Sequence, residues 1–214
     1  MLNPTLRWLA RYRQVVVIVA GCIALSIIGV GCSSSSSSEP DSAASGASSS
    51  ATVHNDADIE FAQMMIPHHE QAVVMAEMVP SRTNNAEMIS LAEAIKVAQA
   101  PEIVQMTGWL QAWNAPLSSG SQDGDGHGHA DHGSDAGANA GMMSADQMQQ
   151  LEQLNGAAFD TEWLEMMIEH HEGAVEMSKQ ELAAGENAEA KALAQQIITS
   201  QQVEINEMQQ MLKG

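Results

Sequence analysis

The stretch Asp58-Ile-Glu-Phe-Ala-Gln-Met-Met-Ile-Pro-His-His-Glu-Gln-Ala-Val-Val-Met75 returns later in the chain as Asp160-Thr-Glu-Trp-Leu-Glu-Met-Met-Ile-Glu-His-His-Glu-Gly-Ala-Val-Glu-Met177. At an offset of 102 positions, residues 58–110 align with residues 160–212 without a gap and share 22 identities in 53 positions. A repeat of this length is an internal duplication. The chain therefore contains one structural unit twice.

Each unit has the pattern of a helical hairpin. Apolar residues recur at spacings of three and four in both halves of the unit, which is typical of amphipathic helices. In the first unit we predict a helix over about residues 56–79, a turn over residues 80–85 and a second helix over about residues 86–113, with a kink at Pro101. Gly185 marks the corresponding turn in the second unit.

A two-helix hairpin cannot bury its own apolar face, so the two copies are expected to close on each other. We predict an all-α protein in which the duplicated hairpin forms a four-helix bundle. Ser144 and Gln147 add the pattern of a capping box, which predicts a short extra helix that ends near Gly156.

The first 31 residues resemble a secretory signal peptide of the lipoprotein type. Arginines precede an apolar run over residues 15–31, and Cys32 and a run of serines follow it. Cleavage before Cys32 would make this cysteine the first mature residue and the site of lipidation. Cleavage before Cys22 and an uncleaved membrane anchor are the alternatives. We expect the rest of the chain to lie outside the cytoplasm, anchored to the outer face of the cell membrane.

The composition excludes several classes of function. Lys and Arg total 8 against 27 Asp and Glu, which gives a formal net charge of -19. Such a surface repels phosphate, so nucleic-acid binding is excluded and cations are the favoured ligands. Both cysteines lie in the N-terminal segment, which leaves no disulfide framework, thiolate zinc site or cysteine nucleophile for the folded part. The chain is instead rich in Met, with 15 residues, and in His, with 8.

The duplicated segment places these ligands on one helical face. On a helical wheel His68 lies in the middle of an apolar stripe, with Met64 one turn before it, and His69 lies at the edge, with Met65 one turn before it. Thioether and imidazole groups suit copper, since Met favours Cu(I) and His binds either oxidation state. The candidate metal ligands are Met64, Met65, His68, His69 and Met75 in the first unit and Met166, Met167, His170, His171 and Met177 in the second.

The second helix of each unit carries polar residues in its apolar stripe, namely Gln99 and Glu102 in the first unit and Gln201 and Glu204 in the second. Buried polar groups are unfavourable unless they are paired, so we expect the buried His and Glu residues to meet each other or a common ligand. A plainer alternative stays open, in which each Met fills the core and each His makes a core hydrogen bond.

The segment between the units, residues 114–143, is rich in Gly, Ser, Asp and Ala and contains His127, His129 and His132. It is too long for an ordinary bundle connection, and we expect it to be disordered when nothing is bound. Three His within six residues can hold one Cu(II), Ni(II) or Zn(II) ion. We predict an auxiliary metal site here, with a solvated linker that binds nothing as the alternative.

The two motifs Met-Met-Ile-Pro-His-His-Glu-Gln-Ala and Met-Met-Ile-Glu-His-His-Glu-Gly-Ala, each followed by the stripe of a second helix, resemble domain-of-unknown-function family 305. The resemblance covers about residues 54–213. It implies a ferritin-like four-helix bundle that is often exported, and some members of the family are periplasmic copper-binding proteins linked to copper resistance. It also implies that the ten Met and His residues named above are the metal-binding positions.

We therefore expect a lipid-anchored extracytoplasmic protein that sequesters copper or passes it on without catalysis. Its expected partners are copper ions and the membrane, and the sequence indicates no particular protein partner. One alternative is a di-iron enzyme, but such sites need a Glu three residues before a ligating His, and those positions hold Met65, Ile66, Met167 and Ile168. The other alternative is a metal-free interaction module of the cell envelope.

The expected organisation has five segments, of which the two hairpins form one bundle domain over residues 54–214. They are the signal peptide (1–31), a Ser-rich tether (32–53), the first hairpin (54–113), the Gly/Asp/His-rich linker (114–143) and the second hairpin (144–214).

Overall fold

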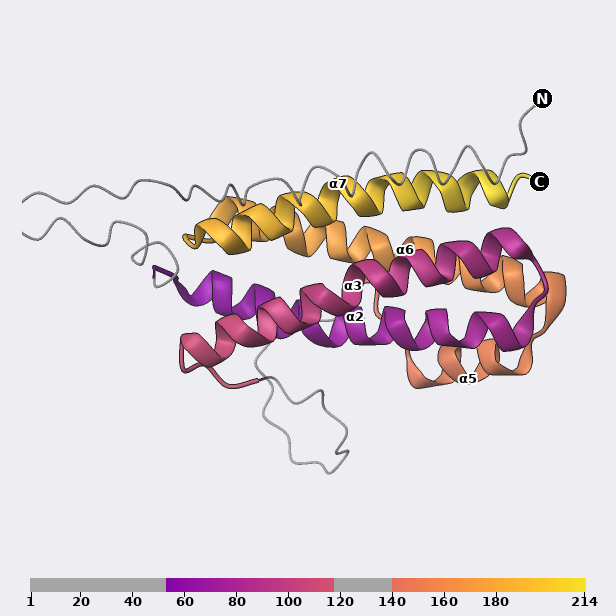
Figure 1. Ribbon diagram of the computed structural model, residues 1–214, viewed down its shortest axis with the longest axis horizontal. Coiled ribbons are helices and arrows are strands. Elements are labelled where there is room, and N and C mark those ends of the chain that lie inside the picture. The colour runs from indigo at the N-terminus through magenta and orange to yellow at the C-terminus, as the bar shows by residue number, and fades with distance from the viewer. Residues whose placement is uncertain (1–52, 118–139) are drawn as a thin grey trace, which may run out of the picture. The chain divides into compact units, whose positions relative to one another are not determined.

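The structure is a computed structural model that describes residues 53–117 and 140–214. In these two ranges the chain forms helices and no strand (Figure 1), and the prediction of an all-α protein is confirmed. The helices are α2 (Asp56–Arg82), α3 (Ala86–Ala112), α5 (Ala145–Gln153), α6 (Gly156–Ala184) and α7 (Ala188–Met211). The predicted lipidation site Cys32 and the linker residues His127, His129 and His132 lie outside the described residues. None of the helices in the two described ranges has the length and apolar character needed to span a membrane.

Side-chain caps explain where α2, α3, α5 and α7 begin, whereas α6 begins without one. Asn55, Asn85 and Asn187 each accept hydrogen bonds from backbone N–H groups in the first turn of α2, α3 and α7. The capping box predicted for Ser144 and Gln147 is present at the start of α5. These contacts satisfy N–H groups that have no partner within the helix itself.

The first helix is longer than predicted, because α2 passes through Pro80 and ends at Arg82. A proline near the end of a helix removes only one backbone hydrogen bond. The N–H of Thr83 still donates to the carbonyl of Val79, which closes the last turn. The second helix, α3, is continuous through Pro101, an exposed position where the freed carbonyl can bond to water.

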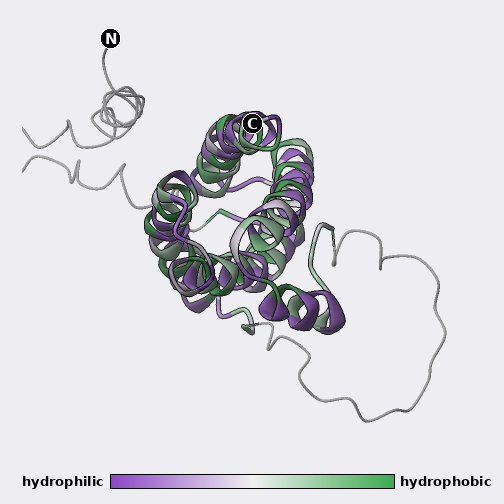
Figure 2. Cartoon of the chain, turned by 90° about the vertical axis from the view of Figure 1, so that its right-hand side faces the viewer, coloured by the Kyte–Doolittle hydropathy of each residue, from purple (hydrophilic) through white to green (hydrophobic). Residues whose placement is uncertain are grey.

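The two units of the duplication form a four-helix bundle, as predicted. Within each unit the two long helices pack along each other, α2 on α3 and α6 on α7, and the units meet mainly through α2 and α6. Figure 2 looks along the long helices and shows them around a common axis, with α5 on the outside.

A layer of polar side chains divides the core into two apolar clusters. Each long helix gives one half to the first cluster and the other half to the second, and two polar residues separate the halves. We call these eight residues the central polar layer. They are His68 and His69 on α2, Gln99 and Glu102 on α3, His170 and His171 on α6, and Gln201 and Glu204 on α7.

Two aspartates at equivalent positions of the repeat tie the hairpins together at opposite ends. Asp58, at the start of α2, accepts hydrogen bonds from the backbone N–H groups of Glu186 and Asn187 in the turn between α6 and α7. Asp160, in the first turns of α6, accepts from Thr83 Oγ1 in the turn between α2 and α3, at 3.1 Å. Each hairpin therefore holds the turn of the other.

A second carboxyl, that of Glu181, is buried beside Asp58. Burial, together with the neighbouring Asp58, raises the pKa of Glu181 to about 8. Burial also acts to raise the pKa of Asp58, but backbone N–H donors, Asn55 first, outweigh it and hold that pKa below its usual value. At neutral pH the pair therefore carries one negative charge, on Asp58.

This pair predicts that the protein loses stability as the pH rises from about 4.5 to about 8. In the unfolded chain Glu181 loses its proton near its ordinary pKa of 4.5, whereas the folded protein keeps that proton to about pH 8. The folded state therefore binds more protons over this window, and the free energy of unfolding falls as the pH rises through it. We expect Glu181→Gln to remove this pH dependence, which should change the free energy of unfolding by roughly 2 kcal/mol or more across the window.

Urea unfolding at pH 5, 7 and 9 measures this difference between the variant and the wild type. The comparison separates Glu181 from groups that titrate in both proteins. Glu172→Gln, an exposed change on the same helix, is the matched control. Equal pH slopes for the wild type and Glu181→Gln would contradict the prediction.

Candidate metal centre

The four predicted histidines come together in the middle of the bundle. His68 and His69 from α2 and His170 and His171 from α6 are each at most 1% exposed. The ring centroids of His68 and His170 are 3.7 Å apart, and those of His170 and His171 are 6.4 Å apart. The duplication therefore delivers two imidazoles from each unit to one buried region.

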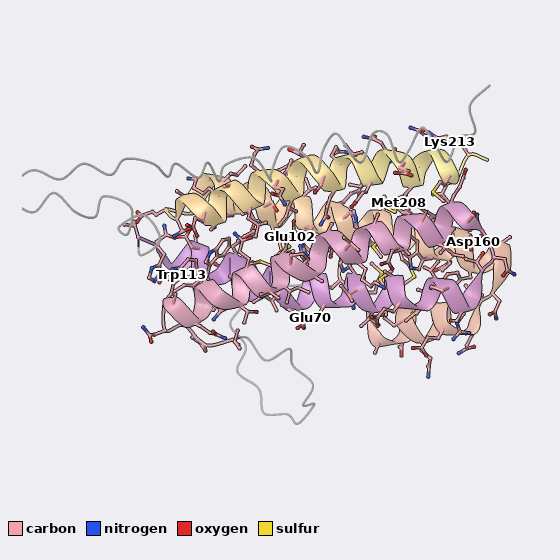
Figure 3. The ribbon with its side chains drawn as sticks, viewed as in Figure 1. Glu70, Glu102, Trp113, Asp160, Met208 and Lys213 are labelled. Atoms are coloured by element: carbon pink, nitrogen blue, oxygen red, sulfur yellow. The ribbon has the colours of Figure 1, made fainter. Side chains whose placement is uncertain are left out.

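Two of these rings are paired with carboxylates from the second helices. His69 Nε2 donates to Glu102 Oε2 at 2.7 Å, and His171 Nε2 donates to Glu204 Oε2 at 2.8 Å. Glu102 lies about halfway along the bundle in Figure 3 and also accepts a hydrogen bond from Gln196. The expectation that the buried His and Glu residues meet is confirmed.

The opposite ring nitrogens have no such partners. Among the described residues, Nδ1 of His68, His69, His170 and His171 is buried without a hydrogen-bond partner. A ring that donates from Nε2 carries its lone pair on Nδ1, and a carboxylate behind a histidine is the usual outer-shell partner of a metal-binding imidazole. Unpartnered buried nitrogens are unfavourable by themselves, so these atoms fit a ligand that accepts their lone pairs.

Burial keeps the imidazole rings of His68 and His170 neutral. Burial first, and then the neighbouring His69, lower the pKa of His68 to about 3, although the Ala140 carbonyl acts in the opposite direction. Burial and the neighbouring His68 also lower the pKa of His170 well below its usual value. At physiological pH both rings therefore keep the lone pair that a metal ion needs.

The methionines predicted as metal ligands lie on both sides of the central polar layer. Met65 and Met177 belong to one apolar cluster, and Met75, Met166 and Met167 belong to the other. Each cluster thus combines sulfur atoms from both units of the duplication. The remaining predicted ligand, Met64, is only partly buried and packs at the edge of the first of these clusters.

Two further methionines and two glutamines belong to the same region, although they were not among the predicted ligands. Met106 and Met208 are fully buried and follow Glu102 and Glu204 by one turn of helix or slightly more. The side-chain amide of Gln99 and the amide oxygen of Gln201 are buried without a partner in the described part of the chain. The signal was present in the sequence, because all four residues align between the two units.

Within residues 53–117 and 140–214, no group of three or more His, Cys, Asp or Glu side chains is arranged to hold a metal ion. The donor set of the central region is mixed, with imidazole nitrogens in the polar layer and thioether sulfurs on either side of it. This combination is typical of copper sites, because a thioether favours Cu(I) and an imidazole accepts both oxidation states.

A duplicated helical hairpin with His-His pairs in a Met-rich core defines a recognisable class of protein. The family model described as domain of unknown function DUF305 matches residues 58–212, and the chain belongs to this family. A comparison with curated protein sequences gives no significant match.

Similar solved structures include two DUF305 proteins and one protein in copper-bound forms. A putative secreted DUF305 protein from Streptomyces coelicolor is 32% identical, with a TM-score of 0.64 over 73% of this chain and 91% of that one. A DUF305 fragment from Deinococcus radiodurans is 29% identical, with a TM-score of 0.62 over 74% and 97%. CopM in its Cu(II)-bound form is 32% identical, with a TM-score of 0.59 over 73% and 95%. CopM has also been solved in Cu(I)-bound and silver-bound forms.

Proposed function

We propose that this protein is an extracytoplasmic copper-binding protein that sequesters copper or passes it on without catalysis. The observation that carries the proposal is the set of four buried imidazoles whose Nδ1 atoms have no hydrogen-bond partner in the described residues, set between two Met-containing clusters. The His and Met residues predicted from the sequence are the proposed ligands, and Met106 and Met208 join them.

The chemistry of these groups supports copper over harder ions. Mg²⁺ and Ca²⁺ take oxygen ligands, whereas this region offers mainly nitrogen and sulfur. Glu102 and Glu204 are engaged by His69 and His171, which suits them to orient the rings. The similarity to CopM, which has been solved with Cu(I) and with Cu(II), agrees with this assignment.

The type of ligands supports binding without catalysis. A carboxylate-bridged di-iron site needs a Glu three residues before the ligating His on two of its helices. Here those positions are occupied by Met65 and Ile66 on α2 and by Met167 and Ile168 on α6. The histidines are also enclosed by apolar clusters, which favours holding an ion over exposing it to a substrate.

In its proposed role the bundle lies outside the cytoplasm, tethered through a lipid on Cys32. The apolar run before Cys32 and the Ser-rich segment after it support this. A similar protein, from Streptomyces coelicolor, is described as a putative secreted protein.

Competitive titration of the full chain, purified in detergent, with Cu(I) and Cu(II) tests the function. A variant in which His127, His129 and His132 are all replaced by Asn separates the linker from the bundle. We expect tight, stoichiometric Cu(I) binding in both proteins. Binding that disappears in the variant would assign the metal to the linker, and the absence of binding in both would favour a metal-free envelope module.

A further inference from the structure

The last residues of the predicted linker (114–143) lie against the helices beside the metal-binding region. We call residues 140–143 the strap. Its anchor is Gln71 on α2, whose side-chain amide donates to the carbonyl of Met143 at 2.8 Å and accepts from the N–H of the same residue at 2.7 Å. The Met143 side chain is buried in an apolar cluster, so the end of the strap is fixed by both polar and apolar contacts.

The strap approaches α6 at a position that only glycine allows. A Cβ atom at Gly173 would overlap the Ala140 carbonyl and lie 2.9 Å from the backbone nitrogen of Gly141. Gly141 itself has a φ of 73°, in the left-handed region that favours glycine. The backbone of the strap therefore lies directly on the backbone of α6.

The strap contacts one of the two central histidines. His68 Nε2 lies 3.1 Å from the carbonyl oxygen of Ala140. A carbonyl can only accept, so this ring nitrogen carries the hydrogen and the lone pair is on Nδ1. His170 is the counterpart of His68 in the repeat, and within the described residues neither of its ring nitrogens has a hydrogen-bond partner.

The two anchoring positions are themselves equivalent in the repeat, since Gln71 aligns with Gly173. One unit uses this position to bind the strap by hydrogen bonds, and the other uses it to make room for the strap. The two positions hold different residues because a single strap crosses the bundle and contacts each of them in a different way. The strap also makes the environments of His68 and His170 different in an otherwise duplicated region.

We propose that the strap fixes the Nε2–H tautomer of His68, with Gln71 and Gly173 as positioning residues, and so presents Nδ1 of His68 as a preorganised copper ligand. His170 then remains the adaptable ligand of the pair. This inference rests on the proposed copper-binding function. Fixing the tautomer in advance removes a cost of ordering when the metal binds.

The test uses two strap variants of the full chain and one matched control. Gly173→Ala displaces the strap, and Gln71→Leu removes both hydrogen bonds to Met143. Gly108→Ala is the control, because it makes the same substitution inside a helix, at an exposed position where an added Cβ meets no atom of the described residues within 4 Å. Thermal unfolding followed by circular dichroism identifies any variant that does not fold, and two independent strap variants guard against that outcome.

The first readout is the tautomer of His68 in metal-free protein, from long-range ¹H–¹⁵N correlation spectra of the imidazoles. We expect a pure Nε2–H tautomer in the wild type and in Gly108→Ala, and a mixture in both strap variants. The second readout is the affinity for Cu(I), which we expect to fall about 10-fold or more in the strap variants, as for the loss of other outer-shell partners.

Two results would overturn the inference. One is an unchanged His68 tautomer in both strap variants, and the other is a changed tautomer with the Cu(I) affinity of the control. A wild-type protein that binds no copper would instead refute the proposed function. The tautomer spectra of the metal-free protein keep these failures apart, because they need no metal.

Discussion

The double variant His68→Phe/His170→Phe is expected to lose tight copper binding, with a fall in affinity of at least about 100-fold. Loss of an outer-shell partner alone costs 10- to 100-fold in metal affinity, and this variant removes two ligand nitrogens directly. Phenylalanine keeps an aromatic ring of similar size between the two apolar clusters, so the bundle should still fold. Competition with a Cu(I) chelator of known affinity measures the effect.

The matched control is His54→Phe. His54 lies before α2 and stacks on Trp113 with ring centroids 4.7 Å apart, away from the central polar layer. This substitution should leave copper affinity unchanged. Wild-type affinity in the double variant would mean that His68 and His170 are ordinary core residues and that the metal binds elsewhere.

The second large effect is expected from Met65→Leu/Met167→Leu. Each of these fully buried methionines precedes a carboxylate-paired histidine by one turn. The substitution removes two thioethers, so we expect the Cu(I) affinity to fall about 100-fold, while the Cu(II) affinity changes much less, because imidazole binds both oxidation states. Parallel titrations with Cu(I) and Cu(II) measure the loss of affinity for each oxidation state.

Met88→Leu is the control for packing. Met88 is equally buried but lies near the start of α3, well before Gln99. Replacing Met by Leu in a core usually costs less than 1.5 kcal/mol per site, so both the double variant and Met88→Leu should fold like the wild type. A similar fall for both oxidation states would indicate that Met65 and Met167 act by packing and not as ligands of Cu(I).

The repeat is sufficient to predict the hairpins and their closure into a bundle, because two amphipathic helices with one apolar face need a partner. It also predicts that buried His residues meet Glu102 and Glu204 or a common ligand, since polar residues recur in both apolar stripes. Only the structure shows that His69 and His171 are the ones paired with these carboxylates. These predictions use features that the two units share, and a shared feature of a duplicated sequence is a strong signal.

The features that differ between the units could not be predicted in this way. The strap depends on Gln71 in one unit and on Gly173 in the other, and neither residue has an evident purpose until Ala140 is placed between the helices. Glu181 aligns with Val79, so its burial beside Asp58 breaks the repeat. The end of α2 beyond Pro80 is closed by the hydrogen bond from the N–H of Thr83 to the carbonyl of the buried Val79, a contact that the local helix-breaking signal of a proline does not reveal.

The reciprocal contacts of Asp58 and Asp160 bear on how such a bundle originates. Each aspartate accepts hydrogen bonds from the turn of the other hairpin. A single hairpin cut from this chain would therefore lack the aspartate that binds its turn. Two separate copies of one ancestral hairpin could make the same contacts as a symmetric dimer. Gene fusion would then join the copies without altering the interface, and would leave the connecting segment free to diverge.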